Sequence, residues 1–223
     1  MTRLLILAAL LPLSACVSLL PEGGDLAPRL SLEAGQPTDA PGAPLGVSLA
    51  VTDPRTEAVF NTANVAVQTS PLQYEYLAGA EWTDRAPQLL GLFLERRFEN
   101  TRRFAAVGDR VALPVADYAL LTDIRAINLD RTTGDRKAVV AYGARIVDRR
   151  GRSLGNRIFR AEAAADGNGN DAAVRALNAA ARQVADETIA WSIALIEEGE
   201  VRAAAEAEAE AERKAALRRR ARS

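Results

Sequence analysis

The side chain best suited to chemistry in this sequence is the thiol of Cys16, the only cysteine among 223 residues. A single cysteine cannot form a disulfide within its own chain, and it leaves the folded body without a thiolate metal cluster or a cysteine nucleophile. The sequence also has no histidine, which is the commonest metal ligand and the commonest general base near neutral pH. Carboxylate and serine–lysine chemistry are the catalytic options that remain.

Asp117 and Asp123 are a carboxylate pair that can be considered for acid–base catalysis. They share one face of a predicted strand, but six residues of extended chain separate them by about 20 Å. Two carboxylates at that distance cannot act together on one substrate, so a solvated strand face explains them better. Arg149, Arg150 and Arg152 lie on a predicted turn, where a plain hydrophilic turn is favoured over contact with an acidic partner. We therefore predict no catalytic residue and no metal site.

Cys16 ends a segment with the layout of an export signal. Arg3 supplies a positive charge, residues 4–11 form a short apolar run, and Pro12 ends that run. The next four residues resemble the lipobox of bacterial lipoproteins, and they are Leu13, Ser14, Ala15 and Cys16. The resemblance implies cleavage before the cysteine, with removal of residues 1–15. It also implies a diacylglycerol on the sulfur and an N-acyl chain, such as palmitate, on the new amino terminus. Apart from these covalent acyl chains, no cofactor is predicted.

Val17 follows the lipidated cysteine and bears on which membrane holds the anchor. In the enterobacterial sorting rule, an aspartate at that position retains a lipoprotein in the inner membrane. Valine instead implies the periplasmic face of the outer membrane, with the inner membrane as the alternative. Three acyl chains exceed the two signals that stable anchoring needs.

Composition divides the rest of the chain into three parts. Residues 16–44 are rich in proline and glycine and predict the lipid anchor and a flexible tether, part of which can still pack on the body. Residues 45–197 carry the apolar periodicity of a folded body. Residues 198–223 are alanine, glutamate and arginine without an apolar stripe, which predicts a solvated extension whose helix is marginal. The alternative for this tail is a basic tip that contacts anionic lipid or an acidic partner.

Apolar periodicity in the body predicts strands, a helix, further strands and a closing helix. The predicted strands are residues 47–51, 63–67, 73–78, 118–129, 137–148 and 154–164. The predicted helices start near Ala86-Pro87 and after residue 171, and the second is expected to run to about residue 197. Thr83 and Asp171 are the predicted caps of the two helices. This order favours an α+β fold in which an antiparallel or mixed sheet carries two helices on one face.

The last three predicted strands are joined by short turns and should form an antiparallel meander. In the first of them, Tyr118, Leu120, Ile124 and Ala126 are expected to share the buried face, because side chains alternate along a strand.

A block of aromatic and apolar residues carries a resemblance to a known family. It reads Tyr74-Glu75-Tyr76, then Trp82, then Pro87-Gln88-Leu89-Leu90. Together with the lipobox, the meander and the closing helix, it resembles the ABC-type transport auxiliary lipoproteins, the PqiC-like family. The resemblance covers residues 1–197 and does not extend to the charged tail.

The resemblance implies a non-catalytic, periplasm-facing lipoprotein. Members of this family work with an MCE-domain protein and an ABC permease and ATPase that move phospholipid or other lipids between membranes. The chain has no phosphate-binding loop of its own. Its net charge of -1 provides no field to attract nucleic acid, so no nucleic-acid partner is expected. Homo-oligomerisation is left open.

Tyr74, Tyr76 and Trp82 are the candidate partner-binding residues, because aromatic side chains supply much of the binding energy at interfaces. The competing interpretation is that they cover the end of the core. Two other functions stay open from the sequence alone. One is a lipoprotein that assembles another outer-membrane or surface structure, and the other is a lipoprotein enzyme that uses carboxylates.

Overall fold

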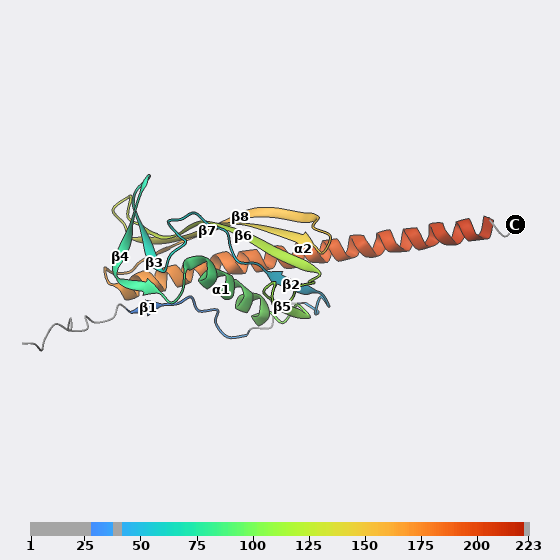
Figure 1. Ribbon diagram of the computed structural model, residues 1–223, viewed down its shortest axis with the longest axis horizontal. Helices are drawn as coiled ribbons and strands as arrows, with labels where there is room; N and C mark the ends of the chain where they lie inside the picture. Colours follow the sequence, from blue (N-terminus) through green and yellow to red (C-terminus); the bar gives the residue numbers. More distant parts are fainter. Residues whose placement is uncertain (1–27, 38–41, 221–223) are drawn as a thin grey trace, which may run out of the picture.

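The computed structural model describes residues 28–37 and 42–220 (Figure 1). This part of the chain forms an eight-stranded mixed sheet and two helices, which confirms the predicted α+β class. In chain order the elements are β1 (Arg29–Leu30), β2 (Ser48–Val51), β3 (Asn64–Ser70), β4 (Gln73–Trp82), α1 (Ala86–Asn100), β5 (Ala106–Gly108), β6 (Tyr118–Asp130), β7 (Lys137–Asp148), β8 (Ser153–Ala164) and α2 (Asn170–Arg220).

The long strand β6 organises the sheet. Along one side it pairs antiparallel with β7 over its whole length, and β7 pairs antiparallel with β8. This is the predicted meander, with strand ends within one residue of the prediction. On the other side β6 pairs in parallel with two different strands. Its start lies beside β2, with Leu49 opposite Tyr118, and its end lies beside β3, with Ala66 opposite Asn128. Strand β5 extends the β2 end, and β4 and β1 extend the β3 end.

A bulge at Arg125 changes which side of β6 faces the core. The β6–β7 register passes from Ile124 directly to Ala126, so Arg125 is an extra residue without a partner on β7. One extra residue inverts the alternation of faces beyond it. Ala126 therefore clusters with Ala141 outside the main core, while Ile127 packs inside it. The prediction that Ala126 shares a face with Ile124 is wrong for this reason.

Both helices cover the same face of the sheet, as predicted (Figure 1). The main core includes Leu90, Phe93 and Leu94 of α1, Leu177, Val184 and Ile196 of α2, and Leu120, Tyr142 and Ile146 of the sheet. One buried polar pair joins the two layers, since the hydroxyls of Tyr142 and Thr188 lie 2.9 Å apart. Thr188 also hydrogen-bonds the carbonyl of Val184 at 2.8 Å. Satisfied buried groups of this kind contribute about 1 kcal/mol each.

The start of α1 differs from the prediction in its cap. Pro87 lies in the first turn as expected, because proline lacks the N–H that is unpaired there. The N-cap is Arg85, which makes no side-chain cap hydrogen bond. Thr83 is not the cap. Its backbone N–H donates to the carbonyl of Leu30 at 2.8 Å and so continues the pairing of β4 with β1.

The folded body begins earlier than the predicted boundary at residue 45. Leu30 pairs in parallel beside Trp82, and Leu30 and Leu32 are buried in the main core. The backbone N–H of Glu33 donates to the side chain of Asn178 on α2 at 2.8 Å. Residues 28–37 thus pack on the body instead of acting as a tether. The predicted signal peptide, Cys16 and Val17 lie outside the described residues.

Helix α2 begins at Asn170, so Asp171 lies in its first turn and is not a cap outside it. The helix does not end near residue 197 as predicted but runs without a break to Arg220. Residues up to Ile196 contribute to the core, whereas residues 201–219 are exposed throughout. This exposed part, here called the α2 extension, projects beyond the sheet (Figure 1). None of the helices in the described ranges is long and apolar enough to cross a membrane.

Candidate interaction surfaces

The hairpin of β3 and β4 forms an arm whose base pairs with β6 through residues 66–68 and whose tip stands away from the rest of the molecule (Figure 1). The arm turns at Pro71 and Leu72, and the Leu72 side chain at its tip is 93% exposed. Only the last two residues of β4 pair with β1, so most of β4 has one edge without a strand partner among residues 28–37 and 42–220. Gly79 has φ +69°, a conformation that favours glycine, where the register between β3 and β4 shifts. The shift bends the arm out of the sheet.

Tyr74 and Tyr76 lie on one face of the arm, since they are two residues apart on β4. Their side chains are 37% and 48% exposed. The ring of Tyr74 meets Phe60 edge to face, with the centroids 5.5 Å apart. The hydroxyl of Tyr76 donates to the carbonyl of Val59 at 3.4 Å. Both rings are thus oriented by the loop before β3 while part of each stays open to solvent.

Partial burial raises the pKa of Tyr74, and the carboxylates of Glu57 and Asp130 raise the pKa further. Tyr74 therefore remains a neutral phenol at physiological pH and can donate a hydrogen bond to a partner. A rigid ring with a polar tip and little side-chain entropy to lose is well suited to an interface.

Trp82 does not belong to this exposed surface. Its side chain is fully buried, with 0% exposed. Its backbone N–H donates to the carbonyl of Ala63 at 2.6 Å, and β1 runs beside it. Trp82 is buried because it lies at the end of β4, where the strand returns from the arm to the core. Of the three aromatic candidates, the structure brings only Tyr74 and Tyr76 together on an accessible face.

The open face of the sheet, opposite the helices, carries a shallow groove that the sequence analysis missed. Its floor is Gly143 of β7, which has no side chain, and the Arg125 guanidinium lies near the position that a Cβ of Gly143 would occupy. Leu121 and Ile158 are exposed in the same groove, and Arg55, Asp123, Arg145 and Arg157 also line it. These arginines come from four separate segments, so no local charge run marks them. Of these arginines only Arg145 alternates with buried neighbours, Ala144 and Ile146, along a regular strand.

The two aspartates considered for acid–base catalysis belong to different surroundings. Asp123 lines the groove of the open face, where Arg55 forms a backbone bridge with it. Asp117 instead accepts hydrogen bonds from the backbone N–H of Ser48 at 2.9 Å and from its hydroxyl at 2.8 Å. These bonds from Ser48 lower the pKa of Asp117. Asp117 therefore ties β6 to β2 as an anion.

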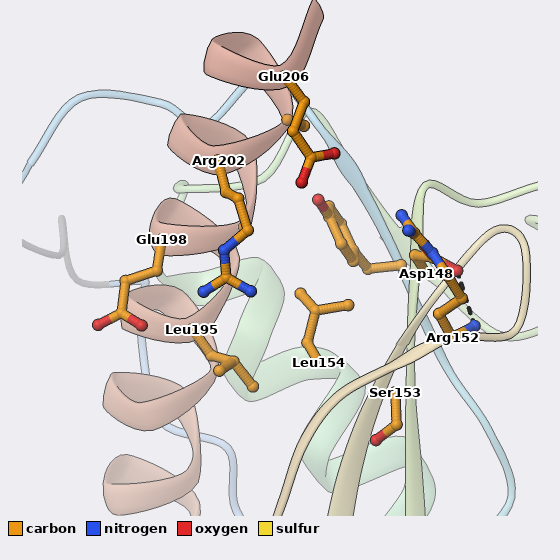
Figure 2. Close-up of a pocket in the computed structure, with 11 residues that line it drawn as sticks. Asp148, Arg152, Ser153, Leu154, Leu195, Glu198, Arg202 and Glu206 are labelled. Carbon is orange, nitrogen blue, oxygen red and sulfur yellow. Dashed lines mark hydrogen bonds and ion pairs between the residues drawn. The ribbon is translucent and has the colours of Figure 1, made fainter.

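A pocket lies where α2 leaves the body, between that helix and the turn from β7 to β8 (Figure 2). Arg202 and Glu206 point from α2 toward the pocket in Figure 2. Beside it, Tyr118 donates a hydrogen bond to Glu200, and Arg152 binds the carboxylate of Asp148 at 2.8 Å. These contacts hold the base of the α2 extension against the sheet, so the pocket has a structural role.

The turn at this pocket contains the arginine cluster noted in the sequence. Burial on its own would raise the pKa of Asp148, but hydrogen bonds from the Arg152 side chain and from the backbone of Arg152 and Arg150 outweigh burial and lower the pKa. The Asp148 carboxylate thus caps its own turn, with Gly151 at φ +78° completing it. Within residues 28–37 and 42–220, no cluster of three or more cysteine, aspartate or glutamate side chains is arranged to hold a metal ion.

The similarity of this chain to a known family covers the folded body. Residues 29–190 match the family described as "ABC-type transport auxiliary lipoprotein component". An uncharacterized protein of Bradyrhizobium diazoefficiens is 32% identical over 152 residues, which is 67% of this chain and 40% of the relative. The chain thus spans less than half the length of that relative.

Solved structures share the fold. The crystal structure of protein XCC0632 from Xanthomonas campestris has a TM-score of 0.67 at 22% identity, covering 78% of this chain and 96% of that one. A second crystal structure, of an uncharacterized protein, has a TM-score of 0.56 at 16% identity, covering 73% of this chain and 97% of that one. The match to the family begins at β1 and ends within α2, before the α2 extension.

Proposed function

This chain belongs to the family of ABC-type transport auxiliary lipoprotein components, and we propose that it is a non-catalytic docking subunit of a lipid transport system. In this proposal Cys16 carries the acyl chains that hold the protein at the periplasmic face of the outer membrane. The body binds an MCE-domain protein, which is associated with an ABC permease and ATPase. The complex moves lipid between the membranes and supports the integrity of the envelope.

The observation that carries the docking role is the exposed arm. Leu72, Tyr74 and Tyr76 follow one another at every second position of a hairpin that projects from the body. Apolar and aromatic side chains that are held in place before binding lose little entropy when a partner covers them. The free edge of β4 adds unpaired backbone groups beside the same side chains. A partner strand or loop that covers the arm would satisfy both.

The arrangement of charged groups supports a role without catalysis. The carboxylates of Asp117 and Asp148 have lowered pKa values. The first accepts hydrogen bonds from Ser48, and the second accepts them from the β7–β8 turn. A general acid or base would instead need a pKa near the working pH and access to a substrate. The membership of the chain in a family of transport auxiliary components points the same way.

The alternative function is assembly of another outer-membrane or surface structure by the same lipid-anchored body. The exposed arm fits such a role equally well, because it specifies a contact and not the identity of the partner. The two functions differ in what the protein binds in the envelope, so the partner itself must be identified.

The test is affinity purification from detergent-solubilised envelope that contains the MCE-domain protein and the ATPase. The bait proteins are the wild type, Cys16→Ala and the double variant Tyr74→Ala/Tyr76→Ala. We expect the wild type to recover both transport proteins. Removal of the two rings should reduce recovery by about tenfold or more, as loss of interface anchors does. Loss of acylation should remove Cys16→Ala from the membrane fraction and reduce its recovery of the complex.

A matched control shortens two other exposed apolar side chains, Val111 and Val115, which are distant from the arm in sequence. The variant Val111→Ala/Val115→Ala should recover the transport proteins as the wild type does. Recovery of neither transport protein by the wild type would reject the lipid-transport proposal. Recovery of components of a different surface assembly would establish the alternative.

A further inference from the structure

The end of the α2 extension is a basic tip, defined here as residues 213–219. Its charged side chains are Arg213, Lys214, Arg218 and Arg219, and no aspartate or glutamate occurs among residues 213–223 of the sequence. All residues of the basic tip are exposed. Within the described part of the chain, no carboxylate lies within ion-pair distance of Arg213, Arg218 or Arg219. The positive charge of these arginines is therefore available to another molecule.

Two ordinary roles of cations on a helix account for only part of the basic tip. Lys214 pairs with Glu210 at 2.6 Å, but their side chains are 68% and 64% exposed, and exposed pairs add little stability. Basic residues also complement the negative end of the helix dipole, but this effect is confined to the last turn. Arg213 lies about two turns before Arg220, where α2 ends. A contact outside the chain explains a basic block of this length better.

An exposed apolar side chain lies among these cations. Leu217 is 59% exposed. It follows Arg213 by four residues and Lys214 by three, so the three side chains share one face of the helix, which Arg218 continues. On a phospholipid surface, an apolar side chain enters the boundary of the acyl chains while long basic side chains reach the phosphates. An acidic protein needs only the cations, whereas a lipid surface also accommodates the leucine.

The acidic part of the α2 extension faces the body of its own chain. Glu206 and Glu210 line a pocket with Arg149 of the β7–β8 turn. At the base of the extension, the hydroxyl of Tyr118 donates a hydrogen bond to Glu200. These contacts fix the direction in which the helix leaves the body. An anionic surface also repels the glutamates, so contact with such a surface is restricted to the basic tip.

The basic tip is far from the point where the N-terminal segment joins the body. Strand β1 and the end of α2 lie at opposite ends of the long axis of the molecule (Figure 1). Helix α2 has 51 residues and so spans about 76 Å, at 1.5 Å per residue. Acylation of Cys16, as proposed above, attaches the chain to a membrane through the segment that precedes β1. The α2 extension then points away from the attachment.

We propose that the basic tip of α2 binds the anionic phospholipid headgroups of a second membrane surface, while the acyl chains hold the protein in the first. The protein then bridges two lipid surfaces. This inference rests on the proposed acylation of Cys16, but it does not depend on which transport protein the arm binds.

The experiment uses the full, acylated chain in vesicles of neutral phosphatidylcholine, where the basic tip has no anionic lipid beside it. Fluorescent target vesicles contain phosphatidylcholine alone or phosphatidylcholine mixed with anionic phosphatidylglycerol. The measured quantity is the amount of each target that the protein-bearing vesicles capture. We expect capture of the anionic targets and not of the neutral ones. High salt should reduce this capture, because it screens exposed charges.

Variants of the basic tip separate the contributions of charge and apolar contact. The variant Arg213→Gln/Arg218→Gln/Arg219→Gln should reduce capture of the anionic targets at least about tenfold, because each basic residue near an anionic surface contributes attraction. The charge-preserving variant Arg213→Lys/Arg218→Lys/Arg219→Lys should capture them as the wild type does. Leu217→Ala should reduce capture by a smaller factor, because it removes only the apolar contact.

The control variant Arg85→Gln/Arg96→Gln/Arg110→Gln removes the same charge from exposed arginines of the body. It should capture the anionic targets as the wild type does. Circular dichroism of each variant reports whether α2 remains helical. Co-flotation of the protein with its own neutral vesicles reports whether the acyl anchor is present, so failure of the anchor is distinguished from failure of the basic tip.

The proposal is wrong if the wild type, anchored in neutral vesicles, captures no anionic target or captures neutral and anionic targets equally. It is also wrong if the glutamine variant captures as much as the wild type. Anchored wild type that captures no anionic vesicle, but binds beads coated with polyglutamate, would instead assign the basic tip to an acidic protein.

Discussion

Individual polar residues hold the sheet of this protein together at points where strands begin. Asp117 is the clearest case, because its carboxylate accepts two hydrogen bonds from Ser48 at the start of β2. The backbone N–H of Asp117 in turn donates to the hydroxyl of Ser48 at 3.0 Å. This reciprocal pair sets the parallel register of β2 and β6. The carboxylate that the sequence offered as a candidate acid or base is thus structural.

The lowered pKa of Asp117 predicts how stability depends on pH. Its pKa lies below the ordinary aspartate value of about 3.9 in the folded chain only. The anion therefore stabilises the fold above that ordinary value, and the contribution is lost as the pH falls through the folded-state pKa. We expect Asp117→Asn to be less stable than the wild type at pH 7 and to lose less stability on acidification. Urea unfolding at pH values from about 7 down to 2 measures this.

The variant Ser48→Ala tests the cause. It keeps the carboxylate but removes the hydroxyl donor, so it should show part of the same loss at neutral pH and a weaker dependence on pH. If Asp117→Asn and the wild type lose stability in parallel as the pH falls, the carboxylate does not contribute as inferred.

At the scale of elements, the β3–β4 arm and the α2 helix depart most from the expected bounds. Both strands of the arm are longer than predicted, with β4 running to Trp82 and not to residue 78. The end of β4 is stabilised by pairing with β1, which comes from a segment expected to be a tether. Because of the bend at Gly79, one end of β4 packs in the core and the other end belongs to the exposed arm.

Replacing Gly79 is expected to strain this bend. A residue with a Cβ pays roughly 1–2 kcal/mol in the left-handed region, and Gly79 has φ +69°. We expect Gly79→Ala to lower the free energy of unfolding by about that amount, measured by urea denaturation. The comparison variant Gly79→Asn should lose less stability, because asparagine enters the left-handed region more readily than alanine. Equal effects of the two substitutions would contradict a special role for the bend.

At the scale of the whole molecule, a compact α+β body carries two projections, the arm and the α2 extension (Figure 1). The body is held by one main core in which both helices and the sheet take part. The tip of the arm and the α2 extension are exposed, so these parts add little to the stability of the body. Two separate projections can make separate contacts with other molecules.

Truncation separates the body from the α2 extension. Ending the chain after Arg202 removes residues 203–219, which are all exposed, and the few residues after them, so the free energy of unfolding in dilute solution should change by less than about 0.5 kcal/mol. Ending it after Thr188 removes the buried Ile193 and Ile196, and we expect that chain not to fold, because each lost core side chain costs roughly 2–5 kcal/mol. Circular dichroism and urea unfolding distinguish the two. A large loss of stability in the chain that ends at Arg202 would show that the extension supports the body.

Local pattern in the sequence was sufficient for the fold class and the meander. Strand alternation and helical periodicity are local properties, and the three long strands lie next to one another in the chain. The lipobox at Cys16 is likewise a local motif, and its lipidation stays a prediction. The family suggested by Tyr74, Trp82 and Pro87 is confirmed by the match over residues 29–190.

Tertiary structure decided what depends on contacts between distant segments. Trp82 is buried because β1 pairs beside it, and Ala126 changes sides because Arg125 bulges from β6. The arginine groove exists only where β6, β7, β8 and the loop after β2 meet. Alternation along one strand says which residues share a face, but not which strands lie together or which face the helices cover. That choice is made by packing of the whole chain, because burial of apolar area is summed over all elements at once.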